Sequence, residues 1–225
     1  MWRAIWLAAG DLLDPRILRL VGACACLGGA TFVGVWFGLD AALAWWLGAD
    51  GALPAALRWL GAAATFVLAW FVFPIVFGAW LGLFLDAVAT TVERRHHPNL
   101  PAARGMPVLP ALLASLRFLA VALAANLLLL VLWLVPPVYA VAWVVVNGWL
   151  LGREYTELVV LRRSPPAAAA AVRQRHGAEV FALGVLFALA MTLPGLNLIL
   201  PVLATAVMVH RVHAWQTSRP QAGGG

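Results

Sequence analysis

The chain has 225 residues, of which 64% are hydrophobic and 11% are charged, and its mean hydropathy is +0.93. A soluble domain of this length does not carry so apolar a composition, so we expect an integral membrane protein. The net charge is +6, and the cationic side chains are all arginine. Because the arginines are scattered over short polar segments, we interpret them as topology signals and expect no nucleic-acid partner.

The first segment, residues 2–13, is predicted to be a short helix lying at the membrane surface. Its tryptophans, Trp2 and Trp6, are expected to face lipid, and Arg3 and Asp11 are expected to face water. No cleavable signal peptide is expected, since acidic residues interrupt the apolar run early.

Two long apolar segments follow, over about 18–47 and 55–95, and each is predicted to span the membrane. The loop after the second segment, 94–104, is rich in arginine and histidine, so the positive-inside rule places it in the cytoplasm together with the N-terminus. Cys24 and Cys26 lie in the first segment without other ligands nearby, and we interpret them as packing residues.

Residues 119–151 form an apolar stretch that is interrupted by Pro136-Pro137. Two prolines break the hydrogen-bond ladder of a helix, so we predict a helical hairpin with arms of about 17 and 14 residues. The preceding residues, 107–118, are predicted to form a separate short helix. A membrane crossing needs about 20 residues, so the arms favour partial penetration.

Residues 179–215 repeat this plan, with Pro194-Gly195 at the interruption and Pro201 after it. Arms of about 15 residues measure roughly 22 Å, against a hydrocarbon core of roughly 30 Å. Arginines flank both ends of each hairpin, which requires the chain to turn back. Two complete crossings per hairpin would also satisfy this charge pattern. The predicted tips consist of Pro136, Pro137, Pro194, Gly195, Leu196 and Asn197.

The predicted fold is therefore all-α, with two long transmembrane helices, two proline-broken hairpins and short interfacial helices. Between the hairpins, Ser164-Pro165 is interpreted as the start of a small helix that Gly177 ends. The two hairpins form a weak internal repeat, which is common in transporters. We expect one membrane domain over 1–216 and a disordered tail over 217–225.

Three motifs resemble the CysZ family of bacterial sulfate permeases. The stretch TLPGLNLILPVLATAVMVHR is similar to the proline–Leu-Asn-Leu–proline hairpin of that family. The stretch WLVPPVYAVAWVVVNGWLLGREYTEL is similar to its Ile-Pro-Gly hairpin and to the Trp, Tyr and acidic positions that follow, here Trp149, Tyr155 and Glu157. In WLGLFLDAVATTVERR, Asp86 stands where the family usually has glutamate. The resemblance extends over about residues 10–215.

The resemblance implies a homo-oligomer in the bacterial inner membrane that takes up sulfate for cysteine biosynthesis. The family's sulfate-binding motif, Gly-aliphatic-Arg-Arg, corresponds here to Arg16-Ile17-Leu18-Arg19. Arg16 replaces the glycine and Leu18 replaces the first arginine, so only Arg19 matches its family position, and Arg16 is a candidate substitute.

Arginine suits an oxyanion because its planar fork matches oxyanion geometry and keeps its charge. We therefore expect Arg16, Ile17 and Arg19 to form an anion-binding entry site, and the hairpin tips to line a passage with free helix amides. The alternatives are that Arg16 and Arg19 are ordinary anchors at the membrane edge, and that Asn197 caps a helix or bonds another helix.

Asp86 is expected either to form a structural ion pair with Arg117 or Arg153 or to contribute to gating. The spacing of His210 and His213 fits a metal, but no third ligand is evident in the sequence, so we predict no metal or other cofactor.

The leading hypothesis is therefore a multi-pass inner-membrane transporter or channel for sulfate or a related small anion, with both termini in the cytoplasm. The alternative is a scaffold or lipid-associated membrane protein that has kept the fold and lost the anion site. An enzyme is not expected, since we find no nucleophile–base pair, metal cluster or phosphate loop in the sequence.

Overall fold

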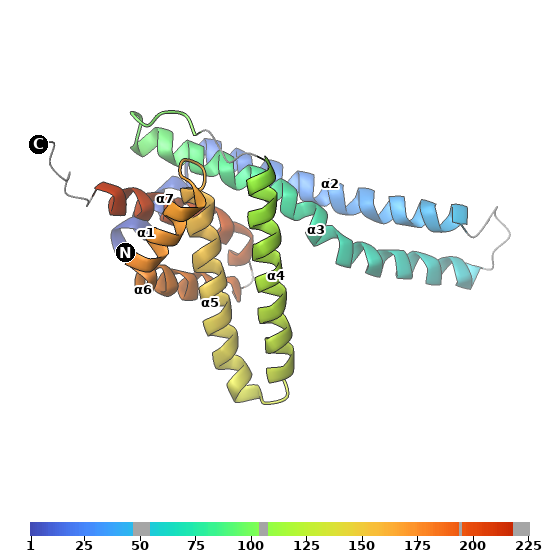
Figure 1. Cartoon of the computed structure of the whole chain (residues 1–225). Coiled ribbons are helices and arrows are strands. Elements are labelled where there is room, and N and C mark those ends of the chain that lie inside the picture. The colour runs from blue at the N-terminus through green and yellow to red at the C-terminus, as the bar shows by residue number, and fades with distance from the viewer. Residues whose placement is uncertain (47–54, 104–107, 194, 218–225) are drawn as a thin grey trace, which may run out of the picture. The chain divides into compact units, whose positions relative to one another are not determined.

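The computed structural model describes residues 1–46, 55–103, 108–193 and 195–217, and in these ranges the regular structure is helical, without a strand (Figure 1). The apolar composition and the unbroken runs of helix-forming residues account for this result. The helices are α1 (Trp2–Asp11), α2 (Pro15–Trp46), α3 (Ala55–His96), α4 (Val108–Leu132), α5 (Pro136–Val160), α6 (Pro166–Met191) and α7 (Leu196–Thr217). The all-helical prediction is confirmed.

The chain forms two compact units. The first unit consists of Met1–Asp14 and Val88–Gly225, and the second unit consists of Pro15–Ala87. Most of α3 therefore belongs to the second unit, while its last turns belong to the first. The single domain over 1–216 stays a prediction. Of the tail expected over 217–225, Thr217 belongs to α7, and the remaining residues lie outside the described part of the chain.

The second unit contains the α2–α3 pair, whose helices run side by side in Figure 1. Of the described helices, α2 is the one that is both long enough and apolar enough to cross a membrane, whereas α3 has a shorter apolar stretch, Trp59–Phe73. Aromatic rings join the two helices, with the ring centroid of Phe32 5.5 Å from those of both Phe66 and Phe73.

The first hairpin bends where the proline pair predicts. Helix α4 ends at Leu132, and α5 begins at Pro136 with Val135 as its N-cap. The prediction of a separate helix over 107–118 is wrong, because α4 runs without a break from Val108. Neither proline nor glycine occurs between residues 111 and 132, so nothing in that stretch stops the helix.

The second hairpin also bends at its predicted position, between Met191 and Leu196. Gly195 has a φ of +83°, a conformation that favours glycine. The helix predicted to end at Gly177 instead continues as α6, with a kink at His176 (φ −119°, ψ 24°). Of the described glycines, Gly195 is the one with positive φ, so Gly177 lacks the left-handed conformation of a glycine helix cap.

Glycines bring the backbones of α5 and α6 into contact. A Cβ atom built on Gly184 would collide with the carbonyl oxygen of Gly148 and lie 2.6 Å from the amide nitrogen of Gly152. Gly148 and Gly152 are four residues apart and share one face of α5, which is the spacing of small residues at close helix contacts in membranes. This contact anchors the core of the first unit, where Leu183 and Phe187 of α6 are buried.

Candidate functional site

The predicted anion-binding stretch forms the first turns of α2. Arg16 and Arg19 are exposed, while Ile17 between them is buried, with 1% of its surface accessible. A spacing of three residues places both guanidinium groups on the same side of the helix. The N-terminus of a helix adds partial positive charge, so this end of α2 has the electrostatics that an oxyanion requires. Its role in anion binding stays a prediction.

The tip of the first hairpin offers fewer amide donors than a typical helix start. Pro136 and Pro137 occupy the first two positions of α5, where neither has an N–H group, and the amide of Tyr139 donates to the carbonyl of Val135. Val138 therefore carries the remaining N–H of this turn. A passage lined by several free amides, as the sequence suggested, has little support at this tip.

The tip of the second hairpin is formed by Gly195, Leu196 and Asn197. The backbone amide of Asn197 donates to the carbonyl of Leu193 at 3.3 Å, and the side chain of Asn197 is exposed. Pro194 lies outside the described residues. An exposed carboxamide at this tip leaves both predicted roles open, a helix-to-helix bond and a ligand contact.

The predicted ion pair of Asp86 involves two candidate arginines. Asp86 is exposed on α3, and Arg117 is exposed on α4. Arg153 binds a carboxylate of its own helix, with its Nε atom 3.0 Å from Oε1 of Glu157. The pairing of Asp86 and its part in gating stay predictions.

A buried carboxylate, whose ion pairs were not predicted from the sequence, joins three segments of the first unit. Glu93, near the end of α3, is 2% exposed and receives a two-pronged contact from Arg163, at 3.2 and 2.8 Å. Arg162, also buried, lies 2.7 Å from the same carboxylate, and His213 of α7 lies 3.3 Å from it. Glu93 thus connects the end of α3 to the α5–α6 loop and to α7.

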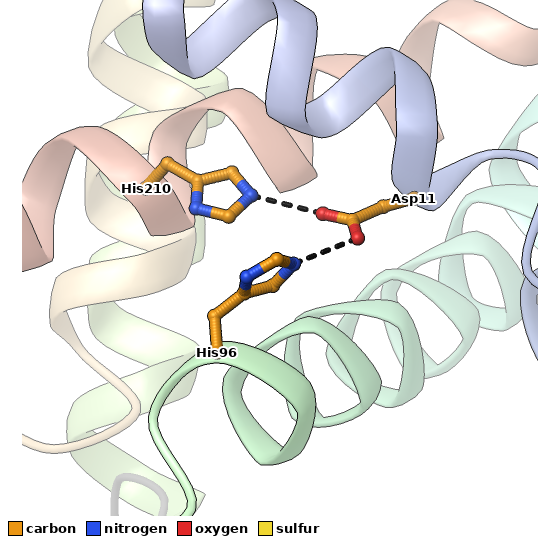
Figure 2. Close-up of side chains that lie close together, drawn as sticks. All are labelled: Asp11, His96 and His210. Carbon is orange, nitrogen blue, oxygen red and sulfur yellow. Dashed lines mark hydrogen bonds and ion pairs between the residues drawn. The ribbon is translucent and has the colours of Figure 1, made fainter.

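A second buried carboxylate, Asp11, connects α1 to the end of α3 and to α7. Figure 2 shows the imidazoles of His96 and His210 approaching different oxygens of the Asp11 carboxylate, at 2.8 and 2.9 Å. Arg95 also lies 3.3 Å from Asp11. The prediction that Asp11 faces water is wrong, since only 2% of its surface is exposed and α7 covers it.

A cavity of about 380 Å³ lies beside these histidines. Its lining residues are Arg3, Ala4, Leu7, His96, His97, His210, Arg211, His213, Ala214 and Thr217. None of these described lining residues is acidic. The cavity wall combines two arginines with four imidazoles. Arg211 is paired with Glu179 at 2.5 Å, and His96 and His210 contact the carboxylate of Asp11, so acidic groups next to the lining residues offset part of the positive charge.

Burial and charge set the protonation states at this end of the unit, beyond the apolar stretches of the helices. Burial alone would raise the pKa of Glu93, but hydrogen bonds from His213 and Arg163 and the charge of Arg162 hold it well below its usual range. Burial lowers the pKa of His210, against the opposing effect of Asp11, and burial with the neighbouring histidines lowers the pKa of His97. Near neutral pH, Glu93 is therefore ionised and the imidazoles of His210 and His97 are neutral.

The sequence carried part of the signal for this cluster. The pair His210 and His213 is visible in the sequence, but Asp11, which contacts His210, lies 199 residues away in the chain. A stronger hint was available in the number of acids, because nine Asp and Glu residues in so apolar a chain each require compensation. Asp11 and Glu93, next to apolar helices, were the natural candidates.

Comparison with known proteins places the chain in a family. No curated protein matches it. The family described as "Sulfate transporter CysZ/Etoposide-induced protein 2.4" matches residues 4–201, which include six of the seven described helices in full or nearly so. The match extends over most of the sequence, and the chain belongs to the sulfate transporter CysZ/etoposide-induced protein 2.4 family.

Proposed function

We propose that this protein moves sulfate or a related small oxyanion across the bacterial inner membrane and so supplies sulfur for cysteine biosynthesis. The observation that carries the proposal is the family match over residues 4–201, since the family description names a sulfate transporter. The membrane setting agrees with the apolar α2 and with the many exposed apolar side chains of the other helices.

The charges of the chain support an anion as the substrate. Arg16 and Arg19 project from the first turns of α2, and the cavity of the first unit is lined by Arg3, Arg211 and histidines. A dianion that leaves water needs such compensation, and exposed arginines provide it without trapping the ion in a closed site. In our proposal, Arg16 and Arg19 bind the anion at the membrane edge and Ile17 fixes the helix between them.

We further propose that α2 and α3 cross the membrane and that the two hairpins enter it only partly. For α2 the support is its apolar length. For α3, whose described apolar stretch is only Trp59–Phe73, the support is its ring contacts with α2, and for the hairpins it is the apolar length of their arms. Although α4 has 25 residues, its described apolar stretch is Leu116–Leu132. The turn of the first hairpin is exposed and apolar, with Trp133 67% and Leu134 81% accessible, as expected for a tip immersed in lipid. Two copies or more would be required to enclose a pathway between such hairpins.

Sulfate flux into proteoliposomes tests the proposal. Vesicles that contain the wild-type protein should accumulate radiolabelled sulfate faster than empty vesicles. Arg19→Gln should reduce the flux at least about tenfold, because a charge-assisted contact contributes roughly 1.5–3 kcal/mol. The matched control is Arg175→Gln, which removes an exposed arginine of α6 and should leave the flux unchanged. Equal flux in wild type and Arg19→Gln would remove Arg19 from the site.

A second function, a scaffold or lipid-associated protein without transport, is favoured by one observation. Leu18 stands where the resemblance implies an arginine, and 55% of its surface is exposed. An exposed leucine there suits contact with lipid or another protein better than contact with an anion. Folded protein that shows no flux for sulfate, thiosulfate, molybdate or phosphate would support this function over transport.

A further inference from the structure

We propose that Asp11, His96 and His210 form a binding site for a zinc-like divalent transition metal ion, which links α1, the end of α3 and α7. The proposal is independent of anion transport, because it rests on the side chains of the first unit alone. All three residues belong to that unit.

The donor atoms already converge. Nε2 of His96 lies 2.8 Å from Oδ1 of Asp11, Nε2 of His210 lies 2.9 Å from Oδ2, and the ligand atoms of all three residues lie within 4.8 Å of one another. In a tetrahedral zinc site with bonds of roughly 2.0–2.1 Å, neighbouring donors are about 3.3 Å apart. Small side-chain movements therefore convert the present hydrogen-bonded arrangement into a coordinating one.

The orientation of the rings supports this inference. The imidazoles of His96 and His210 are nearly perpendicular, with an interplanar angle of 76° and ring centroids 4.6 Å apart. Figure 2 shows both rings directing a nitrogen at the same carboxylate from two different helices. Two rings that approach one carboxylate at this angle leave a small space between the three side chains for a metal ion. Stacked rings would leave no such space.

The ligand types indicate the kind of metal. Two imidazoles and one carboxylate are borderline and hard donors, the combination that zinc accepts in sites with three protein ligands. His96 and His210 also line the cavity of about 380 Å³, so water or a small anion can reach a fourth coordination position. The site is therefore of the open type.

The competing explanation is a hydrogen-bonded cluster without metal, reinforced by Arg95, which lies 3.3 Å from Asp11. The two explanations differ in what glutamine would do at the histidine positions. A glutamine amide can donate a hydrogen bond to Asp11, so it preserves a hydrogen-bonded cluster, but it is a poor zinc ligand.

The experiment measures zinc binding to the untagged, detergent-purified chain after chelator treatment, by equilibrium dialysis with Zn²⁺ alone. We expect about one zinc ion per wild-type chain. His96→Gln and His210→Gln should each lower the affinity at least about tenfold while the thermal unfolding temperature without metal changes little. Cobalt in place of zinc should give visible absorption bands in the wild type that the two variants lack.

The matched control is His176→Gln. His176 stacks on Trp215 with ring centroids 4.6 Å apart and is not among the three proposed ligands. This variant should bind zinc like the wild type. Wild-type protein without stoichiometric zinc, or His96→Gln and His210→Gln variants that bind zinc as tightly as His176→Gln, would overturn the proposal.

Discussion

Two helix pairs of this molecule pack by opposite means. In the first unit, α5 and α6 approach until their backbones touch, because Gly148 and Gly184 face each other without side chains. In the second unit, α2 and α3 are joined through aromatic rings, in which Phe32 meets Phe66 edge-on at 5.5 Å. Even the glycine of that contact, Gly28, makes room for a ring, since a Cβ atom there would lie 2.8 Å from Cε2 of Phe77.

The difference matters because lipid is as apolar as leucine, so burying apolar surface gives helices little reason to associate in a membrane. The first unit relies on close backbone packing and on buried ion pairs around Glu93 and Asp11. The second relies on ring contacts that can shift. We therefore expect the first unit to tolerate substitution poorly and the second to tolerate it well.

The largest effect is expected for Glu93→Gln. An amide cannot balance the charges of Arg162 and Arg163, and breaking a buried ion pair from one side costs roughly 3–5 kcal/mol. The counterpart in the second unit is Asp40→Asn, where the partner is the hydroxyl of Thr65 at 3.3 Å and the cost should stay below about 1 kcal/mol. Thermal unfolding in detergent measures both, and similar losses for the two variants would contradict the comparison.

Gly184→Ala should cause the second-largest loss of stability. The added methyl group meets the backbone of α5, which has no side chain that can move aside, so the helices must separate at a cost of about 1–3 kcal/mol. In α2, a Cβ atom on Gly34 meets nothing within 4 Å, and Gly34→Ala should be neutral or stabilising by up to about 1 kcal/mol. A neutral Gly184→Ala would show that the close contact of α5 and α6 is not needed.

The pH dependence of stability should depend on the first unit. Hydrogen bonds and charge hold the pKa of Glu93 below its ordinary value of 4.5, so the unfolded chain takes up a proton at this position before the folded chain does. The stabilisation is complete above that value and declines as the pH falls below it. Unfolding temperatures between pH 6 and pH 3.5 should fall more steeply for wild type than for Glu93→Gln, and parallel curves would contradict this expectation.

The positions of the helix breaks could be predicted from the sequence, because Pro136-Pro137 and Gly195 act on their own backbone. The ends of the helices were harder to predict from the sequence. The start of α4 lay farther back than expected, and Gly177 did not stop α6. The contacts of Asp11 could not be predicted, since they join segments 85 and 199 residues apart in the chain. Only the tertiary packing of α1 against α7 makes that aspartate a partner of two histidines.

The smallest effect is expected for Phe32→Leu in the second unit. Leucine keeps the apolar surface, so the substitution removes mainly the edge-on ring contacts with Phe66, Trp70 and Phe73. An aromatic pair contributes about 0.5–1.5 kcal/mol beyond the area it buries, and neighbouring rings can reorient to recover part of that. We expect a loss of about 1 kcal/mol, measured by thermal unfolding against Phe71→Leu, which affects an exposed ring of α3. A loss as large as that of Gly184→Ala would mean that ring contacts bind helices as rigidly as backbone contacts, and the two units would then differ in chemistry but not in their tolerance of substitution.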